Sequence, residues 1–161
     1  MNIFILDKNI KKCAQYHCDK HVGKMILESA QMLSTAVRLA GDDIGYKVTH
    51  QNHPCMVWTR KSLSNWIWLQ NLARALNKEY RFRFDKSINH KSYDLIQSLP
   101  LPKIQDHGLT SFAQVMPEIY KNQNPVIAYR GYYVGEKKHL LSWNNKRTPP
   151  DWLKNLWIRA L

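Results

Sequence analysis

The chain lacks the features that mark secreted and membrane-spanning proteins. Only three residues are cysteine, at Cys13, Cys18 and Cys55, and an odd number of thiols does not make a disulfide framework. The first residues are apolar too briefly for a secretory leader, and no apolar run approaches the length of a membrane span. We therefore expect reduced thiols, a cytoplasmic location and no membrane partner.

Linkers and repeats are missing as well. No Gly/Ser-rich stretch, low-complexity segment or internal repeat divides the chain. A length of 161 residues is usual for one domain, and a hydrophobic content of 44% is enough for a core. Six Trp, eight Tyr and four Phe argue against disorder, because they bury large apolar areas. These features predict one folded domain over residues 1–161.

Acidic residues are scarce relative to basic ones. Asp and Glu total 12 against 24 Lys and Arg, which gives a net charge of +12 and an isoelectric point near 9.7. Such a surplus attracts polyanions, and the release of counterions from phosphates is its common use. The composition favours a nucleic acid as the partner. A merely soluble basic protein and an anionic membrane surface are the alternatives.

The hydrophobic pattern is helical along most of the chain. Apolar residues recur at three- and four-residue steps on one face of 11–39, at Val22, Ile26, Ala30, Leu33 and Val37. We expect further helices over 54–84, with an interruption near 62–64, and over 93–99, 111–115 and 125–141. We also expect a terminal helix from Asp151 that docks through residues including Trp157 and Leu161. Residues 2–6 form a short strand or a buried extended segment. The pattern predicts an all-α or nearly all-α orthogonal bundle.

The first long helix carries a second stripe, which is polar. Steps of three and four residues place six side chains on one face: His17, His21, Lys24, Glu28, Gln31 and Thr35. A solvated face with a Lys24–Glu28 ion pair is one interpretation, and a functional groove is the other. Glu28 is the carboxylate that we expect to act in chemistry, because it has both amines and apolar side chains as neighbours.

A metal site is a weak interpretation of Cys13, His17, Cys18 and His21. Structural zinc sites take ligand pairs from two separate segments, and this cluster has no second half. We therefore expect neither a metal nor a cofactor.

Several other segments offer contacts to an anion. The loop His50-Gln51-Asn52-His53-Pro54 lies at a helix start, where free N–H groups suit a phosphate, although His53 can also simply cap the helix. Between Arg60 and Lys91, eight basic residues against two acidic ones give a net charge of +6. The Tyr129–Tyr133 segment, with Arg130, is a further candidate. We expect phosphate contacts from Lys20, Lys24, His50, Asn52, Arg60, Lys61, Arg74, Lys78, Arg81, Arg83 and Arg130.

The order of several motifs resembles the pyrimidine-dimer DNA glycosylases of the phage endonuclease V type and their bacterial relatives. The motifs are the opening MNIFILD, the helix with Lys24 to Gln31, Gly45-Tyr46 running into Asn52-His53-Pro54, and Trp68-Leu69 through Glu79-Tyr80 to Phe84-Asp85. They cover roughly the first 90 residues. The chain also looks like small proteins of tailed phages, which implies the cytoplasm of a host cell.

This resemblance implies a helical DNA-binding fold and a glycosylase with coupled strand-cleaving lyase activity. In that family an N-terminal α-amine attacks the sugar carbon and forms an imine with the help of a helix glutamate, whose place Glu28 matches. His21 and His53 would assist. The departure is at the start of the chain, because Asn2 does not favour removal of Met1. The amine then belongs to Met1, or Lys20 or Lys24 replaces it, or there is none.

Three functions follow from the sequence. The first is a base-excision enzyme acting on a damaged or modified base in DNA. The second is a non-catalytic nucleic-acid-binding module, which would tolerate the loss of Glu28. The third is a protein that binds or processes a nucleotide or another small phosphate, with weak affinity for long DNA.

Overall fold

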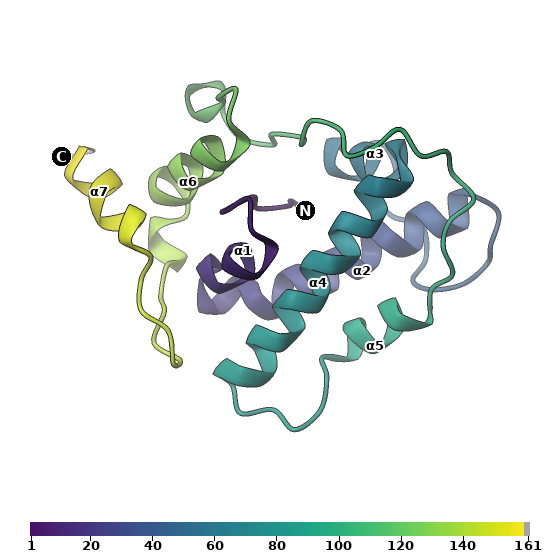
Figure 1. Ribbon diagram of the computed structural model, residues 1–161, viewed down its shortest axis with the longest axis horizontal. Coiled ribbons are helices and arrows are strands. Elements are labelled where there is room, and N and C mark those ends of the chain that lie inside the picture. The colour runs from purple at the N-terminus through teal and green to yellow at the C-terminus, as the bar shows by residue number, and fades with distance from the viewer. Residues whose placement is uncertain (160–161) are drawn as a thin grey trace.

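The computed structural model describes residues 1–159, and side chains as far as residue 156. It confirms the predicted all-α class, since residues 1–159 contain helices and no strand (Figure 1). The predicted docking of Trp157 and Leu161 falls outside the described side chains. In chain order the elements are α1 (Ile10–Tyr16), α2 (Asp19–Leu39), α3 (Pro54–Lys61), α4 (Leu63–Arg83), α5 (Lys91–Ser98), η1 (Glu118–Tyr120), α6 (Pro125–Glu136), η2 (Lys138–Leu140) and α7 (Asp151–Arg159).

The two longest helices, α2 and α4, pack against each other and organise the core (Figure 1). Apolar residues at helical spacing meet between them, including the fully buried Ile26 and Leu33 of α2 and Leu69 and Leu76 of α4. None of the helices in residues 1–159 is long and apolar enough to cross a membrane.

The N-terminal segment runs through the core in an extended conformation without joining a sheet. Asn2 to Leu6 are all at most 9% exposed, which fits their nearly continuous apolar sequence. The chain then turns, and the Asn9 side chain caps α1 by accepting a hydrogen bond from the Lys12 N–H at 3.0 Å. The extended alternative of the sequence prediction is therefore the one observed.

The single helix predicted over 11–39 is wrong, because the chain breaks between α1 and α2. His17 and Cys18 are both extended there. The break leaves the last carbonyls of α1 without helical partners. The buried Arg83 side chain of α4 donates to the carbonyls of Gln15 at 2.8 Å and His17 at 2.7 Å, so a tertiary contact stabilises the helix end.

The interruption predicted near residues 62–64 is confirmed between α3 and α4. Ser62 is extended, and its hydroxyl donates to Asp106 Oδ1 at 2.9 Å. The same carboxylate accepts from the backbone N–H of Ser64 at 3.0 Å and so takes the place of a cap at the start of α4.

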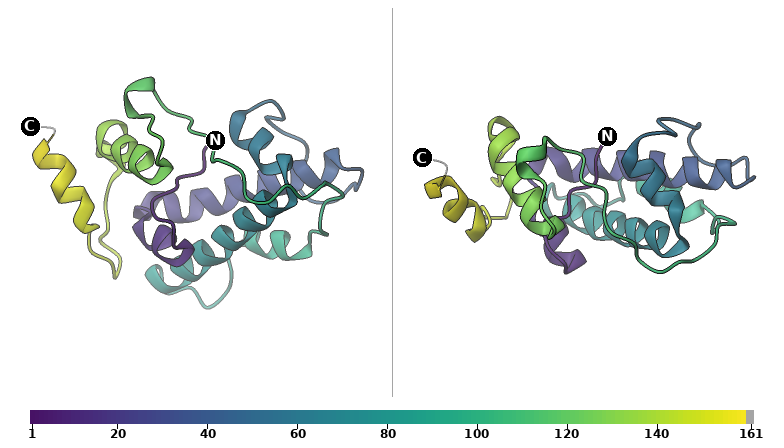
Figure 2. Two further views of the ribbon diagram at one scale, coloured as in Figure 1. Left: turned by 45° about the horizontal axis from the view of Figure 1, so that its top comes forward. Right: turned by 90° about the horizontal axis from the view of Figure 1, so that it is seen from above.

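The second half of the chain departs more from the sequence pattern. The predicted helix over 111–115 is wrong: these residues are irregular, and a single 3₁₀ turn, η1, follows at Glu118–Tyr120. α6 ends at Glu136, and the 3₁₀ turn η2 takes up part of the remaining predicted length to Leu141. Figure 2 shows α6 and α7 beside one another at one end of the molecule.

Candidate active site

The structure brings the N-terminal amine to the carboxylate of Glu28. The Met1 nitrogen lies 3.9 Å from Glu28 Oε2, and the backbone N–H of Asn2 donates to the same oxygen at 3.1 Å. Lys24, one helical turn before Glu28 on α2, places its Nζ 3.9 Å from the other oxygen, Oε1. The Glu28 side chain is only 12% exposed, whereas that of Lys24 is 60% exposed. The carboxylate therefore has one amine near each of its two oxygens.

Asn2 holds the terminus in this position. Its side-chain Nδ2 donates to the carbonyl of Val115 at 3.0 Å, and its Oδ1 accepts from the backbone N–H of Ile3 at 2.8 Å. The Tyr129 hydroxyl of α6 lies 2.9 Å from the same Oδ1. Because Asn2 and Tyr129 are both buried, these bonds are shielded from competition with water. The position of the amine is thus fixed by partners more than 100 residues away in the sequence.

A cavity of about 200 Å³ opens beside this pair. Its inner wall comes from the terminus and from α2, and its outer wall from the second half of the chain, through Val115, Tyr132, Lys137 and Leu140. The Lys137 ammonium lies 5.2 Å from the centre of the Tyr132 ring. The sequence offered the Tyr129–Tyr133 segment as a separate candidate and did not place it beside Glu28. The fold brings Tyr132 of that segment, together with Lys137 and Asn2, to the same cavity as Glu28.

His21 lines the same cavity but is almost fully buried. Its Nδ1 lies 2.6 Å from the Tyr133 hydroxyl, and its ring stacks on Phe4 with a centroid distance of 4.7 Å. Burial, together with the neighbouring His17 and lysines, lowers the pKa of His21 to about 3. The imidazole is therefore neutral near pH 7 and supports the cavity wall rather than supplying a proton.

His53 is the N-cap of α3, as one interpretation of the sequence predicted. Its Nδ1 accepts from the backbone N–H of Cys55 at 3.2 Å. Burial lowers the pKa of His53, the N-terminal ammonium and His50 lower it further, and the Glu28 carboxylate opposes them. His53 thus lies within electrostatic reach of the amine–carboxylate pair while its Nδ1 is occupied by capping.

The Cys55 thiol, which lies beside Asn2, stays protonated near pH 7. Cys55 Sγ lies 3.7 Å from Asn2 Oδ1, and burial raises the pKa of this thiol to about 12. All three cysteines are free and buried. Within residues 1–159, the side chains that the structure describes include no group of three or more His, Cys, Asp or Glu that could hold a metal ion.

The polar stripe predicted along one helix is corrected by the break between α1 and α2. His17 falls outside α2 and is fully buried, with its Nδ1 2.7 Å from the Cys13 carbonyl. Thr35 is buried too, where its hydroxyl bonds with the backbone of Thr49. Only the middle of the stripe, from Lys24 to Gln31, reaches solvent.

Most of the side chains predicted to contact phosphate are accessible. Arg60 donates to the carbonyl of Gln51, and Arg81 donates to those of Lys86 and Ser87, so these two guanidiniums partly serve local structure. Both still reach the surface. The accessible set is Lys20, Lys24, His50, Asn52, Arg60, Lys61, Arg74, Lys78 and Arg81.

Two arginines of the prediction serve the fold instead. Arg83 is 2% exposed and is held by Glu79 and Asp19, so it cannot contact a phosphate. Arg130 donates from Nε to the Leu6 carbonyl at 2.9 Å and from Nη2 to Asp7 at 3.0 Å. Its guanidinium also lies near the rings of Tyr16 and Trp152, so it connects α6 to α1 and α7.

The fold and the site together define a class: a basic, all-α protein with an amine held against a largely buried helix carboxylate. Comparison with known proteins gives the family. The sequence profile of the pyrimidine dimer DNA glycosylases matches residues 1–92, more than half of the chain, and the protein belongs to this family. Membership makes DNA its substrate and DNA glycosylase chemistry its general activity. No curated protein and no solved structure matches the chain.

Proposed function

We propose that this protein is a DNA glycosylase with coupled AP-lyase activity that uses the Met1 α-amine as its nucleophile and acts on a damaged base. The observation that carries the proposal is the 3.9 Å separation of the Met1 nitrogen from the Glu28 carboxylate at the edge of the cavity. Family membership supports excision of a base from DNA. The lyase step and the identity of the amine are our proposal.

The proposed chemistry requires an uncharged amine beside the sugar. The amine nitrogen forms a bond to the C1′ carbon of the deoxyribose, and the bond from C1′ to the base breaks, so that the base leaves with the electron pair and takes up a proton. The sugar ring then opens to give an imine; of the two amine protons, one balances the proton taken up by the departing base and the other passes to the ring oxygen O4′. Removal of a proton from C2′ then breaks the bond from C3′ to the phosphate, which cleaves the strand.

Glu28 contributes through charge and proton transfer. A carboxylate fixed about 4 Å from the reacting nitrogen stabilises the positive charge that develops on the sugar as the base departs. The same group can accept the proton that the amine loses on attack. Its low exposure strengthens both effects, because little water screens it.

The flanking cations suit a phosphodiester. Lys24 and Lys137 line the cavity. Lys20 lies one turn before Lys24 on α2 and is exposed. We propose that these lysines, with Arg60, Lys61 and the exposed loop residues His50 and Asn52, contact phosphates flanking an extruded nucleotide.

The test is borohydride trapping on a duplex with an abasic site, run beside an ultraviolet-irradiated and an untreated duplex. We expect a covalent adduct that peptide mapping places on Met1. Glu28→Gln should slow adduct formation by about 100-fold or more, the usual range for general acid–base groups. The matched control, Glu118→Gln, removes an exposed carboxylate and should leave the rate unchanged.

The outcomes separate the alternatives. An adduct on Lys24 would overturn Met1 as the nucleophile while keeping imine chemistry. Salt-sensitive DNA binding without any adduct would refute the lyase proposal and support a non-catalytic binding module. Neither adduct nor DNA binding would leave a small phosphate-bearing ligand as the substrate class.

A further inference from the structure

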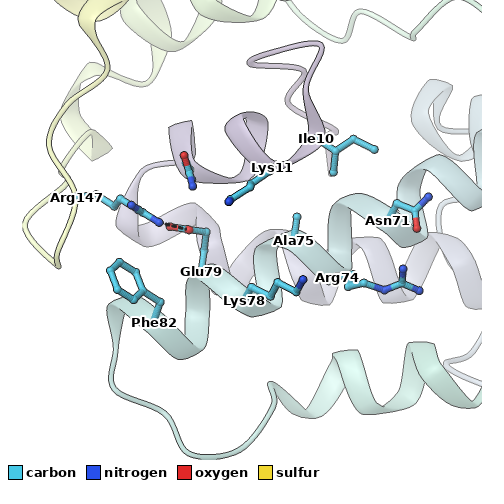
Figure 3. Close-up of a pocket in the computed structure, with 10 residues that line it drawn as sticks. Ile10, Lys11, Asn71, Arg74, Ala75, Lys78, Glu79, Phe82 and Arg147 are labelled. Carbon is cyan, nitrogen blue, oxygen red and sulfur yellow. Dashed lines mark hydrogen bonds and ion pairs between the residues drawn. The ribbon is translucent and has the colours of Figure 1, made fainter.

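A larger cleft lies between α1 and α4, outside the candidate active site. Its volume is about 540 Å³, and none of its lining residues lines the cavity at Glu28. Figure 3 shows its lining residues, with Lys11 on α1 and Arg74 and Lys78 on α4. Ile10 and Ala75 form part of its floor, and Phe82 and Arg147 close one end.

The charge of the cleft is strongly positive. Lys11, Arg74 and Lys78 are all exposed, and no hydrogen bond or ion pair is found for their side chains among the described residues. Among the described residues that line the cleft, the only acid is Glu79, whose side chain is 7% exposed and is already engaged by Arg83 and Arg147. Three cations are therefore available to a ligand, and the one carboxylate beside them is neutralised.

The lining of the cleft also includes exposed apolar surface beside its cations. Phe82 is 45% exposed, and the Arg147 guanidinium lies 4.6 Å from the centre of its ring. Exposed aromatic and aliphatic surface beside unpaired cations suits a ligand with both phosphates and apolar rings or sugars. A strand of nucleic acid has this alternation along its whole length.

The cleft and the candidate active site lie on opposite sides of the core. Met1 lines one and Ile10 lines the other, and the buried segment from Asn2 to Leu6 connects them through the interior. In Figure 2 (right), the N-terminus lies on the side of α2. Helix α1 lies on the opposite side, next to α4. We therefore expect a short duplex that lies against Glu28 to leave the α1–α4 cleft free.

We propose that the α1–α4 cleft is a second nucleic-acid site, which holds the phosphodiester backbone of a DNA segment other than the one at Glu28. Lys11, Arg74 and Lys78 contact its phosphates, and the apolar floor contacts its sugars or bases. The protein can then bridge two DNA segments. This inference does not depend on imine chemistry, because it concerns binding alone.

The test uses short unmodified duplexes labelled with either a donor or an acceptor fluorophore. The wild type should bring two duplexes together and give energy transfer, and Glu28→Gln should do the same. The triple variant Lys11→Gln, Arg74→Gln, Lys78→Gln should lose the transfer while still forming the borohydride adduct on an abasic duplex. The control triple variant, Lys47→Gln, Lys86→Gln, Lys91→Gln, removes the same charge from exposed lysines outside both cavities and should still bridge.

Two further readouts make the result decisive. The slope of log K against log salt concentration for the second binding event should become shallower by about 3 in the cleft variant, at about 0.9 per lost phosphate contact. In the wild type, a saturating duplex should protect Lys11 and Lys78 from acetylation, which needs no variant. A stoichiometry of one duplex per wild-type chain, unprotected lysines, or bridging that survives in the cleft variant would overturn the proposal.

Discussion

Replacing Glu79 with Gln tests the buried charge network that joins the two halves of the chain. Glu79 Oε2 accepts from Arg83 Nε at 2.8 Å, and its Oε1 accepts from Arg147 Nη2 at 2.7 Å. Arg83 also pairs with Asp19 at 3.2 Å. The network thus links α4 to the start of α2 and to the segment before α7.

The expected cost follows from what the substitution leaves behind. The Arg83 side chain is fully buried, so Glu79→Gln keeps its charge inside the protein with one of its two carboxylates removed. Breaking a buried ion pair costs roughly 3–5 kcal/mol. Because Asp19 remains, we expect the lower end, about 3 kcal/mol, or a fall in Tm of about 6–12 °C for a chain of this size.

The assay is urea unfolding followed by tryptophan fluorescence. The matched control is Asp85→Asn, which breaks the exposed pair with Lys146 and should change the free energy of unfolding by less than about 0.5 kcal/mol. A loss below about 1 kcal/mol for Glu79→Gln would refute the assignment of this network as a major stabilising feature.

The same network has a pH signature. Burial raises the pKa of Glu79, but hydrogen bonds and charges from Arg147 and Arg83 outweigh it and hold the pKa below the ordinary 4.5. A carboxyl group whose pKa is lower in the folded protein than in the unfolded chain gives its full stabilisation of the folded state above the pKa of the unfolded chain. That stabilisation is lost as the pH falls through the pKa of the folded protein. The stability difference between wild type and Glu79→Gln should therefore be constant above about pH 5 and narrow at lower pH.

Two further predictions concern groups that the fold buries or constrains. Burial lowers the pKa of His17 from 6.5 to about 4, so the unfolded chain takes up a proton first as the pH falls. We expect this difference to lower the free energy of unfolding by about 3 kcal/mol between pH 6.5 and 4. An imidazole midpoint above pH 6 in an NMR titration of the folded protein would contradict this prediction. Gly45→Ala should destabilise the protein by about 2–4 kcal/mol, because φ is +84° and the new Cβ would lie 2.5 Å from Ser34 Oγ. Gly41→Ala, at φ +113° with open space around it, should cost only about 1–2 kcal/mol in the same urea assay, and equal losses at the two positions would disprove the steric account.

The candidate active site extends beyond the segment that defines the family. Residues 1–92 supply the amine, Glu28 and Lys24, whereas Tyr132 and Lys137 of the outer wall come from the unmatched residues that follow. The family match therefore covers the groups that we propose to react, and the later segment supplies the outer wall of the cavity beside them.

The sequence by itself determined the helical class and the main helices, because their apolar residues recur at a period that only a helix places on one face. The predicted helix starts at Pro54 and Pro125 agree with those of α3 and α6, because proline strongly prefers the first turn of a helix. Glu28 and Lys24 were also identified correctly as neighbours, because four residues make one helical turn.

The tertiary structure decided what depends on partners distant in the sequence. Arg83 of α4 donates to the His17 carbonyl at the break between α1 and α2, and no local preference in the sequence indicated that break. The same contact turns Arg83 from an expected phosphate ligand into a buried structural ion. The position of the Met1 amine depends likewise on Val115 and Tyr129, which bind Asn2 from more than 100 residues further along the chain. Periodicity reports which face of a helix is apolar, and only packing determines what that face, and the charges at its edges, will meet.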